Sequence, residues 1–128
     1  MSYQLQEINR RIDEDVKGFL EECDAQYADK VSQAADTILA KLSTSPIVLL
    51  SGPSGSGKTT TALKIEEELE RRGVLSHTIS MDNYFKTLNP KTVPRTKDGS
   101  IDFESPLCMD MDLLNEHFAK LSKGETII

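Results

Sequence analysis

An eight-residue stretch near the middle of the chain, GPSGSGKT at 52–59, combines glycines, hydroxyl side chains and one lysine. It matches the pattern G-x-x-x-x-G-K-[ST] at every fixed position. Glycine lets the backbone turn with positive φ, and successive N–H groups in such a turn surround an anion. The alternative, a flexible Gly/Ser linker, would not need Lys58 and Thr59 at its end. The spacing therefore predicts a phosphate-binding loop.

The residue types in this loop suggest a division of roles. Lys58 is expected to reach the β- and γ-phosphates of a nucleotide, and the Thr59 hydroxyl to ligate Mg²⁺. The free N–H groups and the dipole of a following helix would add positive potential. The loop alone does not distinguish an ATPase, a GTPase and a small-molecule kinase. The residues predicted to bind the nucleotide are Gly52, Pro53, Ser54, Gly55, Ser56, Gly57, Lys58, Thr59 and Thr60.

The segments around the loop predict an α/β fold. Residues 47–50 are apolar throughout, as is typical of a central strand in a parallel sheet. An amphipathic helix is expected over 58–72, with Gly73 just past its end. We then expect a strand at 76–82 and a long loop or hairpin at 83–100. A helix is expected at 110–123, and the opening of another strand at 125–128. The prediction is a P-loop NTPase-type parallel sheet flanked by helices.

The N-terminal third of the chain has a helical pattern of apolar residues. Their spacing of three and four over 3–42 predicts two helices, with a break near 24–28. We expect these helices to pack on the domain or to lead in from an upstream one; a coiled-coil partner helix is the alternative. Pairing of two copies of the chain through them stays open.

The predicted domain division follows from these patterns. Residues 1–45 form the N-terminal helical segment, and 46–128 form the P-loop domain. The sheet looks incomplete at its C-terminal end, because it stops at a half-begun strand. We therefore expect the N-terminal part of a longer protein.

Composition excludes several classes of protein. The formal net charge of −6 argues against broad electrostatic binding to nucleic acid or to an anionic membrane. The two cysteines lie far apart, which fits free thiols in a reducing compartment. The N-terminus lacks the apolar region of a signal peptide, and the longest apolar run is too short to cross a bilayer. A cytoplasmic protein is predicted.

A carboxylate follows the second predicted strand. Asp82 lies in SMDNYF, where the carboxyl end of a parallel strand faces the ligand crevice of an open α/β sheet. Next to a γ-phosphate, it could accept the proton of an attacking hydroxyl or help to hold Mg²⁺. The alternative is an aspartate that caps a local turn.

Three motifs in this order resemble one known family. GPSGSGKTT, then SMDNYF, then DGSIDFESP with MD shortly after, are similar to the uridine kinase and phosphoribulokinase family of P-loop kinases. The chain looks most like the bacterial uridine kinase-like nucleoside kinases, over about 46–128. The resemblance implies transfer of the γ-phosphoryl group of ATP, with Mg²⁺, to the 5′-hydroxyl of a nucleoside such as uridine or cytidine.

The resemblance also implies roles for single residues. Asp82 matches the family's base for the 5′-hydroxyl, and Tyr84 and Phe85 match the aromatic pair beside the nucleoside. Glu104 stands where typical uridine kinases carry an Asp that holds the ribose hydroxyls, and SP follows it where many relatives have HP. Catalysis would then rest on Asp82 and Lys58, and the metal on Thr59 and Asp82.

The family pattern continues with a Pro-x-Tyr-Asp-Phe stretch and an Arg-bearing lid that these 128 residues do not contain. We therefore expect this chain by itself to be catalytically incomplete or weakly active.

Two other functions stay open. A P-loop kinase for another small acceptor, a sugar phosphate or pantothenate, would use cations near the acceptor, and Arg95 and Lys97 keep it open. A non-catalytic ATP-binding regulatory module would bind the nucleotide without turnover. For Lys91, Arg95 and Lys97 themselves, a solvated loop is the favoured interpretation.

The remaining polar candidates are interpreted as structural. Asp110 and Asp112 stand at a predicted helix start, where carboxylates cap the helix and oppose its dipole. His77 and His117 show no metal-ligand spacing, and Cys108 is expected to pack in the core.

Overall fold

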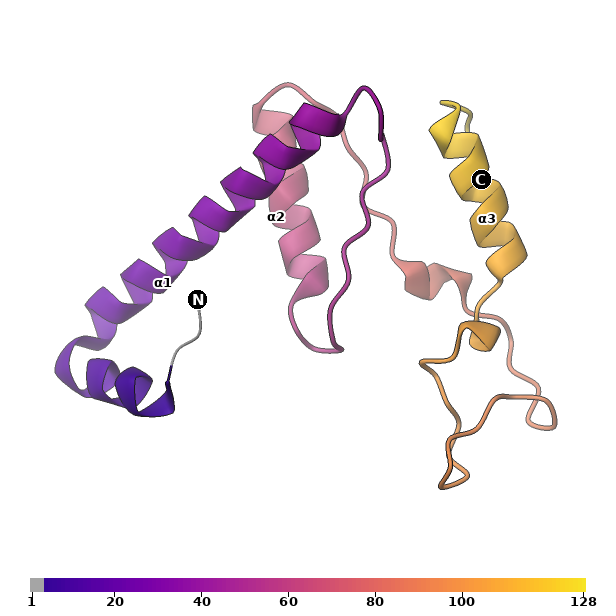
Figure 1. The fold of residues 1–128 in the computed structure, drawn as a ribbon, viewed down its shortest axis with the longest axis horizontal. Helices are drawn as coiled ribbons and strands as arrows, with labels where there is room; N and C mark the ends of the chain where they lie inside the picture. The colour runs from indigo at the N-terminus through magenta and orange to yellow at the C-terminus, as the bar shows by residue number, and fades with distance from the viewer. Residues whose placement is uncertain (1–3) are drawn as a thin grey trace. The chain divides into compact units, whose positions relative to one another are not determined.

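The computed structural model describes residues 4–128, and it consists of helices joined by long loops. Within this described range, three α-helices and two short 3₁₀ helices follow one another (Figure 1). They are α1 (Leu5–Lys41), α2 (Lys58–Arg71), η1 (Met81–Tyr84), η2 (Pro106–Cys108) and α3 (Met111–Ser122). Among the described helices, none is both long and apolar enough to cross a membrane.

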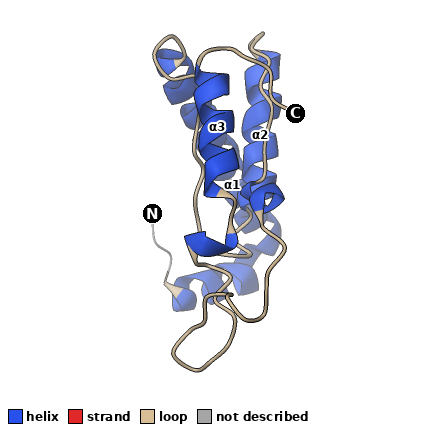
Figure 2. Ribbon diagram, turned by 90° about the vertical axis from the view of Figure 1, so that its right-hand side faces the viewer, coloured by secondary structure: helices blue, strands red, loops and turns tan. Residues whose placement is uncertain are grey.

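The predicted parallel sheet is wrong for this structure. Figure 2 shows helices and loops, and residues 4–128 contain no β-sheet. Two isolated antiparallel bridges, Phe85 with Met109 and Arg95 with Ile101, are the β-pairing that the described residues show. The segments expected to be strands at 47–50, 76–80 and 125–128 have no regular secondary structure, and 81–84 is the 3₁₀ helix η1.

The physical reason lies in strand pairing. A strand is stable only when neighbouring strands take its backbone hydrogen bonds and other elements cover its faces. Val48, Leu49 and Leu50 are 55%, 72% and 45% exposed. The apolar run therefore has the composition of a buried strand without the neighbours that would bury it.

The N-terminal helix is interrupted, but not where the sequence pattern placed the break. α1 is one element with a kink at Asp15, whose φ of −157° and ψ of 79° are not helical. The Asp15 carboxylate accepts a hydrogen bond from the Gly18 N–H at 3.0 Å, as an N-cap does for a new helix. Residues 24–28, where the break was expected, are helical. The prediction of a helical region was right, and its break was misplaced.

The piece before the kink folds back on the piece after it. The Arg11 guanidinium lies 4.9 Å from the centre of the Phe19 ring and forms an ion pair with Glu22. Phe19 is buried, with 9% of its surface exposed. A cation over an aromatic face and an ion pair together close this turn.

The chain divides into two compact units. The first contains residues up to Ala40 and Thr60–Ser76, and the second contains Lys41–Thr59 and His77–Ile128. In the first unit, Val31 and Ala35 of α1 and Leu69 of α2 are buried. α2 ends at Arg71, one residue before the predicted end, and Gly73 follows two residues later with a φ of 82°.

The second unit has its own small core around η1 and α3. Tyr84, Cys108, Leu114 and His117 are buried there. The Tyr84 hydroxyl and His117 Nδ1 are 2.9 Å apart, and the two rings meet edge to face at 5.6 Å. The Asp110 N–H donates to the Tyr84 carbonyl at 2.7 Å. These contacts fix η1 against the start of α3.

Replacing Tyr84 with Phe should destabilise this unit by about 1–2 kcal/mol, because a buried imidazole nitrogen loses its partner. Urea unfolding of the parent chain and the Tyr84→Phe variant measures the effect. In a chain that already carries His117→Ala, the same substitution should cost much less. An equal cost in both backgrounds would show that the hydrogen bond is not the cause.

Candidate functional site

The predicted phosphate-binding loop has the backbone that its glycines suggest. Gly55 and Gly57 have φ values of 72° and 83°, in the region that side chains other than glycine avoid. At Gly52, an added Cβ would lie 3.0 Å from the Ser56 hydroxyl and 3.3 Å from Cγ of Lys58. The Ser56 N–H donates to the Pro53 carbonyl at 3.2 Å and closes the turn. The loop is therefore compact, and it needs glycine at more than one position.

Lys58 opens α2 and folds back over this loop. Its Nζ donates a hydrogen bond to the Pro53 carbonyl at 2.8 Å. Thr59 and Thr60 follow in the first turn of α2, and both are exposed. The first N–H groups of any helix lack partners within the helix, so this end carries positive potential. The arrangement can accept an anion, with a lysine ammonium at its side.

Asp82 lies on the exposed surface of η1. Ser80 caps this short helix, because its hydroxyl accepts from the Asp82 N–H at 3.2 Å. Within residues 4–128, the Asp82 carboxylate itself accepts no hydrogen bond. The alternative role for Asp82 was to cap a local turn. In the structure Ser80 caps this turn, and the sequence analysis did not predict a role for Ser80. A serine two residues before an aspartate is the pattern of such a turn.

The two aromatic residues after Asp82 have different surroundings. Tyr84 is 6% exposed and its hydroxyl is bonded to His117. Phe85 is 41% exposed. Of this pair, Phe85 is the side chain that is open to a ligand, whereas Tyr84 holds η1 to α3.

Glu104 is exposed, in the turn before η2. Its backbone N–H donates to the Asp102 carboxylate at 3.2 Å. Cys108 is fully buried below this turn, with its thiol 3.2 Å from the Asp102 carbonyl. The turn is therefore anchored, and the Glu104 carboxylate is free to meet solvent.

The structure does not join the loop to the predicted acceptor residues. Over the described part of the chain, no hydrogen bond or ion pair links residues 52–59 with Asp82 or Glu104. The same residues contain no cluster of three His, Cys, Asp or Glu side chains that could hold a metal ion. Mg²⁺, however, is commonly held by one or two protein groups together with phosphate oxygens and water. An exposed Thr59 hydroxyl beside the loop fits that mode of binding.

Asp110 and His117, two of the other polar candidates, have structural roles, as expected. Asp110 is the N-cap of α3, and its carboxylate accepts from the Leu113 N–H at 3.0 Å. Asp112 lies in the first turn of α3. His117 is a buried partner of Tyr84, and His77 is exposed.

The cations near Gly99 belong to a self-contained loop. The Arg95 guanidinium donates to the carbonyls of Gly99 at 2.8 Å and Pro90 at 3.3 Å. The Thr96 hydroxyl donates to the Asp98 carboxylate, which also accepts from the Ser100 N–H at 3.0 Å. Hydrogen bonds from Thr96 and Ser100 lower the pKa of Asp98 from 3.8 to about 2.

The lowered pKa of Asp98 makes the stability of this loop depend on pH. Because the pKa of Asp98 is lowered in the folded chain, its stabilising effect is complete above pH 3.8 and is lost as the pH falls through about 2. An NMR titration of the Asp98 carboxyl should give a midpoint near 2. Thr96→Val should move that midpoint upward, whereas an unchanged midpoint would show that the Thr96 hydroxyl is not the cause.

Comparison with known proteins assigns the chain to a family. The model of the phosphoribulokinase / uridine kinase family matches residues 47–128. The chain therefore belongs to this family. The matched region begins just before the loop at 52–59 and runs to the last residue.

Individual relatives agree with this assignment. Over 78 residues, the chain is 36% identical to a uridine kinase of Schizosaccharomyces pombe, and over 83 residues 31% identical to one of Saccharomyces cerevisiae. A uridine kinase of Geobacillus sp. (strain WCH70) is 36% identical over 83 residues. These matches cover 61%, 64% and 64% of this chain, but 17%, 16% and 37% of the relatives. No solved structure matches the chain.

Proposed function

We propose that the chain carries the nucleotide-binding part of an ATP-dependent kinase that phosphorylates the 5′-hydroxyl of a nucleoside, uridine or cytidine. The observation that carries this proposal is the loop at 52–59, with positive φ at Gly55 and Gly57 and Lys58 folded over it. A compact loop of this kind, at the start of a helix, suits the phosphate chain of ATP. In this proposal 46–128 is the kinase domain and 1–45 a helical addition.

The loop residues would grip the phosphates. Lys58 would exchange the Pro53 carbonyl for a phosphate oxygen, and the exchange strengthens its hydrogen bond because the new acceptor is charged. The N–H groups from Gly52 to Thr60 would hold the remaining oxygens. Thr59, with Asp82 nearby in the complex, would hold Mg²⁺, which when bound neutralises charge on the β- and γ-phosphates.

Asp82 would take the proton from the attacking hydroxyl. An exposed carboxylate without a protein hydrogen bond keeps its lone pairs for that proton. Phe85 offers an open ring to the nucleoside, and Glu104 offers a carboxylate to the ribose hydroxyls. Tyr84 would border the nucleoside site through its ring, because its hydroxyl is bonded to His117.

A second candidate is a nucleotide-binding module without turnover. It is favoured by the absence, within residues 4–128, of any hydrogen bond between the loop and Asp82 or Glu104. In contrast, a sugar-phosphate acceptor draws no support from Arg95, whose guanidinium is bonded to the carbonyls of Gly99 and Pro90.

An acceptor assay tests the proposal. The chain is incubated with Mg·ATP and, in turn, uridine, cytidine, pantothenate and a sugar phosphate, and the phosphorylated products are quantified. Formation of uridine or cytidine 5′-monophosphate, at a low rate, is expected. Binding of Mg·ATP with no product from any acceptor would favour the binding module.

The backbone of the loop supplies a prediction of its own. Gly57→Ala should lower the affinity for Mg·ATP about tenfold, because a side chain at a φ of 83° costs roughly 1–2 kcal/mol. Gly99→Ala is the matched control, since Gly99 has a φ of 87° outside the phosphate loop. Isothermal titration calorimetry of both variants makes the comparison. Equal losses of affinity in the two would show that strain anywhere in the chain, rather than in the loop, is responsible.

A further inference from the structure

The N-terminal helix lies beside the helix that follows the phosphate loop. α1 and α2 contact each other within one compact unit, at two places along their lengths. Tyr27 of α1 meets Thr61 at the start of α2, and Ser32 and Asp36 meet Arg72 at its end. Since residue numbers rise in the same direction in both helices, the two run in parallel. Thr61, in α2, and Arg72, just past its last residue, are 11 positions apart, which corresponds to about 16 Å along a helix.

The contact at the end of α2 is a network around one guanidinium. Arg72 donates to the Ser32 hydroxyl at 2.8 Å and the Ser32 carbonyl at 3.3 Å, and it forms an ion pair with Asp36. Its Nε donates to Glu68 within α2 at 3.0 Å. Hydrogen bonds with Asp36 and then Glu68 raise the pKa of Arg72. A planar guanidinium with several acceptors fixes both the spacing and the register of the two helices.

The contact at the start of α2 involves two hydroxyl groups. The Tyr27 hydroxyl lies 3.0 Å from Oγ1 of Thr61. Thr61 is the fourth residue of α2, one turn along from Lys58 and two residues after Thr59. This hydrogen bond therefore attaches α1 to the turn that carries the residues proposed to hold phosphate and Mg²⁺.

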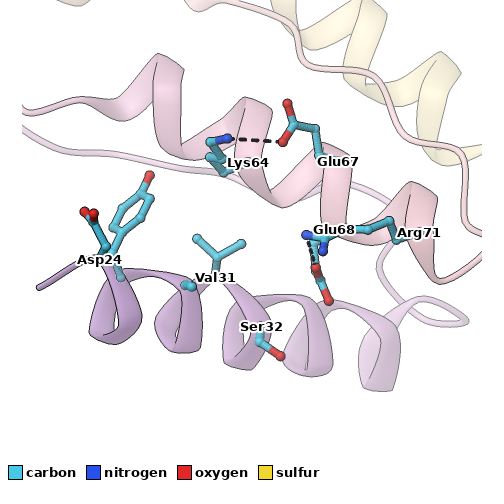
Figure 3. A pocket seen from close by; sticks show the side chains of 9 residues that line it. Asp24, Val31, Ser32, Lys64, Glu67, Glu68 and Arg71 are labelled. Carbon is cyan, nitrogen blue, oxygen red and sulfur yellow. Dashed lines mark hydrogen bonds and ion pairs between the residues drawn. The ribbon is translucent and has the colours of Figure 1, made fainter. Parts of the chain in front are cut away.

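Between the two contacts the helices leave an open groove of about 520 Å³. Figure 3 shows Val31 of α1 pointing across it toward the charged residues of α2. In α2, Lys64 pairs with Glu67, and Arg71 pairs with Glu68. These four charged groups of α2 are therefore paired within their own helix, and Tyr27 and Arg72 make polar contacts between α1 and α2.

We propose that α1 is a brace for α2, and that Tyr27 is a positioning residue for the first turn of the phosphate-loop helix. The proposal rests on the proposed function, because it concerns nucleotide affinity. Terminal turns of helices fray unless a tertiary contact holds them. Fraying of the first turn of α2 would displace Lys58 and Thr59 and the N–H groups beside them. The Tyr27 hydroxyl reduces that fraying, and the affinity for a polyphosphate rises accordingly.

Two variants remove the hydrogen bond with little change in shape: Tyr27→Phe and Thr61→Val. The amides of 62–64 report on the first turn, because they donate to the carbonyls of 58–60. Their hydrogen exchange is measured without nucleotide. It should be about fivefold faster in each single variant than in the parent chain, and no faster in the double variant than in either single variant. Thr37→Val is the control, since the Thr37 hydroxyl donates to the Gln33 carbonyl of its own helix at 3.1 Å.

Nucleotide affinity is the second readout. Tyr27→Phe and Thr61→Val should each weaken Mg·ATP binding about three- to fivefold and leave AMP binding unchanged, because AMP lacks the β- and γ-phosphates. Unchanged exchange at 62–64, or additive effects in the double variant, would overturn the brace. Faster exchange with unchanged Mg·ATP affinity would overturn the positioning role.

The brace and the proposed function can fail separately. Exchange is measured without nucleotide, so it tests the contact between α1 and α2 alone. If the parent chain does not bind Mg·ATP, the proposed function fails, and the positioning role of Tyr27 fails with it.

Discussion

Replacing Lys58 with Ala should lower the affinity of the chain for Mg·ATP by about 10- to 100-fold. A hydrogen bond between charged groups contributes roughly 1.5–3 kcal/mol, and Lys58 is the cation that folds over the loop. The lost ammonium would leave phosphate charge without its nearest counter-charge. Calorimetric titration with Mg·ATP measures the affinity.

The control for this variant is Lys64→Ala. Lys64 lies two turns further along α2, and its Nζ is paired with Glu67 at 3.4 Å. The Lys64→Ala variant should bind Mg·ATP with the same affinity as the parent chain. If the two variants lose affinity equally, the general charge of α2, rather than the loop lysine, attracts the nucleotide.

Replacing Asp82 with Asn should lower phosphoryl transfer to uridine by about 10²- to 10⁴-fold, the usual contribution of a general base. The amide keeps the size of the carboxylate but cannot accept the proton of the 5′-hydroxyl. Mg·ATP affinity should change much less than transfer, because the loop supplies most of the phosphate contacts. Product formation at saturating Mg·ATP separates the two effects.

Asp112→Asn is the matched control for Asp82→Asn, since Asp112 is an exposed aspartate in the first turn of α3. The Asp112→Asn variant should transfer the phosphoryl group to uridine at the rate of the parent chain. Parent-level transfer by Asp82→Asn would exclude Asp82 as the base and leave the proton to another acceptor.

The backbone of the loop at 52–59 could be predicted from sequence because its structure is local. Glycine is the residue type that enters positive φ without cost, and it was predicted to do so here. Gly55 and Gly57 do so, and α2 starts directly after them at Lys58. Gly73 also lies at positive φ, just past the end of α2 as predicted.

The break in α1 shows why an apolar pattern is a weak guide to a helix end. The pattern changes phase near 24–28, yet those residues stay helical. The break occurs where a side chain can replace a backbone partner, at Asp15, which caps Gly18. An aspartate three residues before a glycine was the available signal.

The predicted sheet is wrong for residues 4–128, because strand pairing is non-local and residue types alone do not show whether a strand has neighbours. Residues 47–50 have the composition of a buried strand, yet Leu49 is 72% exposed. Helices such as α2 and α3 close their own hydrogen bonds, so their bounds followed closely from the sequence.

The acceptor role of Asp82, Tyr84 and Phe85 stays a prediction, and the surroundings of the two aromatic residues could not be predicted from the sequence. The resemblance to the kinase family implies that Tyr84 and Phe85 form an aromatic pair beside the nucleoside. In the structure Tyr84 turns inward to His117, a residue 33 positions later, while Phe85 stays exposed. A hydrogen bond between such distant residues leaves no local signal. The cap at Ser80 did leave a local signal, because this serine lies two residues before Asp82.

The most direct test of the central claim compares ATP with AMP. If residues 52–59 grip the β- and γ-phosphates, the parent chain will bind Mg·ATP at least tenfold more tightly than AMP, and Lys58→Ala will remove most of that difference. Equal affinity for the two nucleotides in the parent chain, or a preference that survives Lys58→Ala, would contradict it.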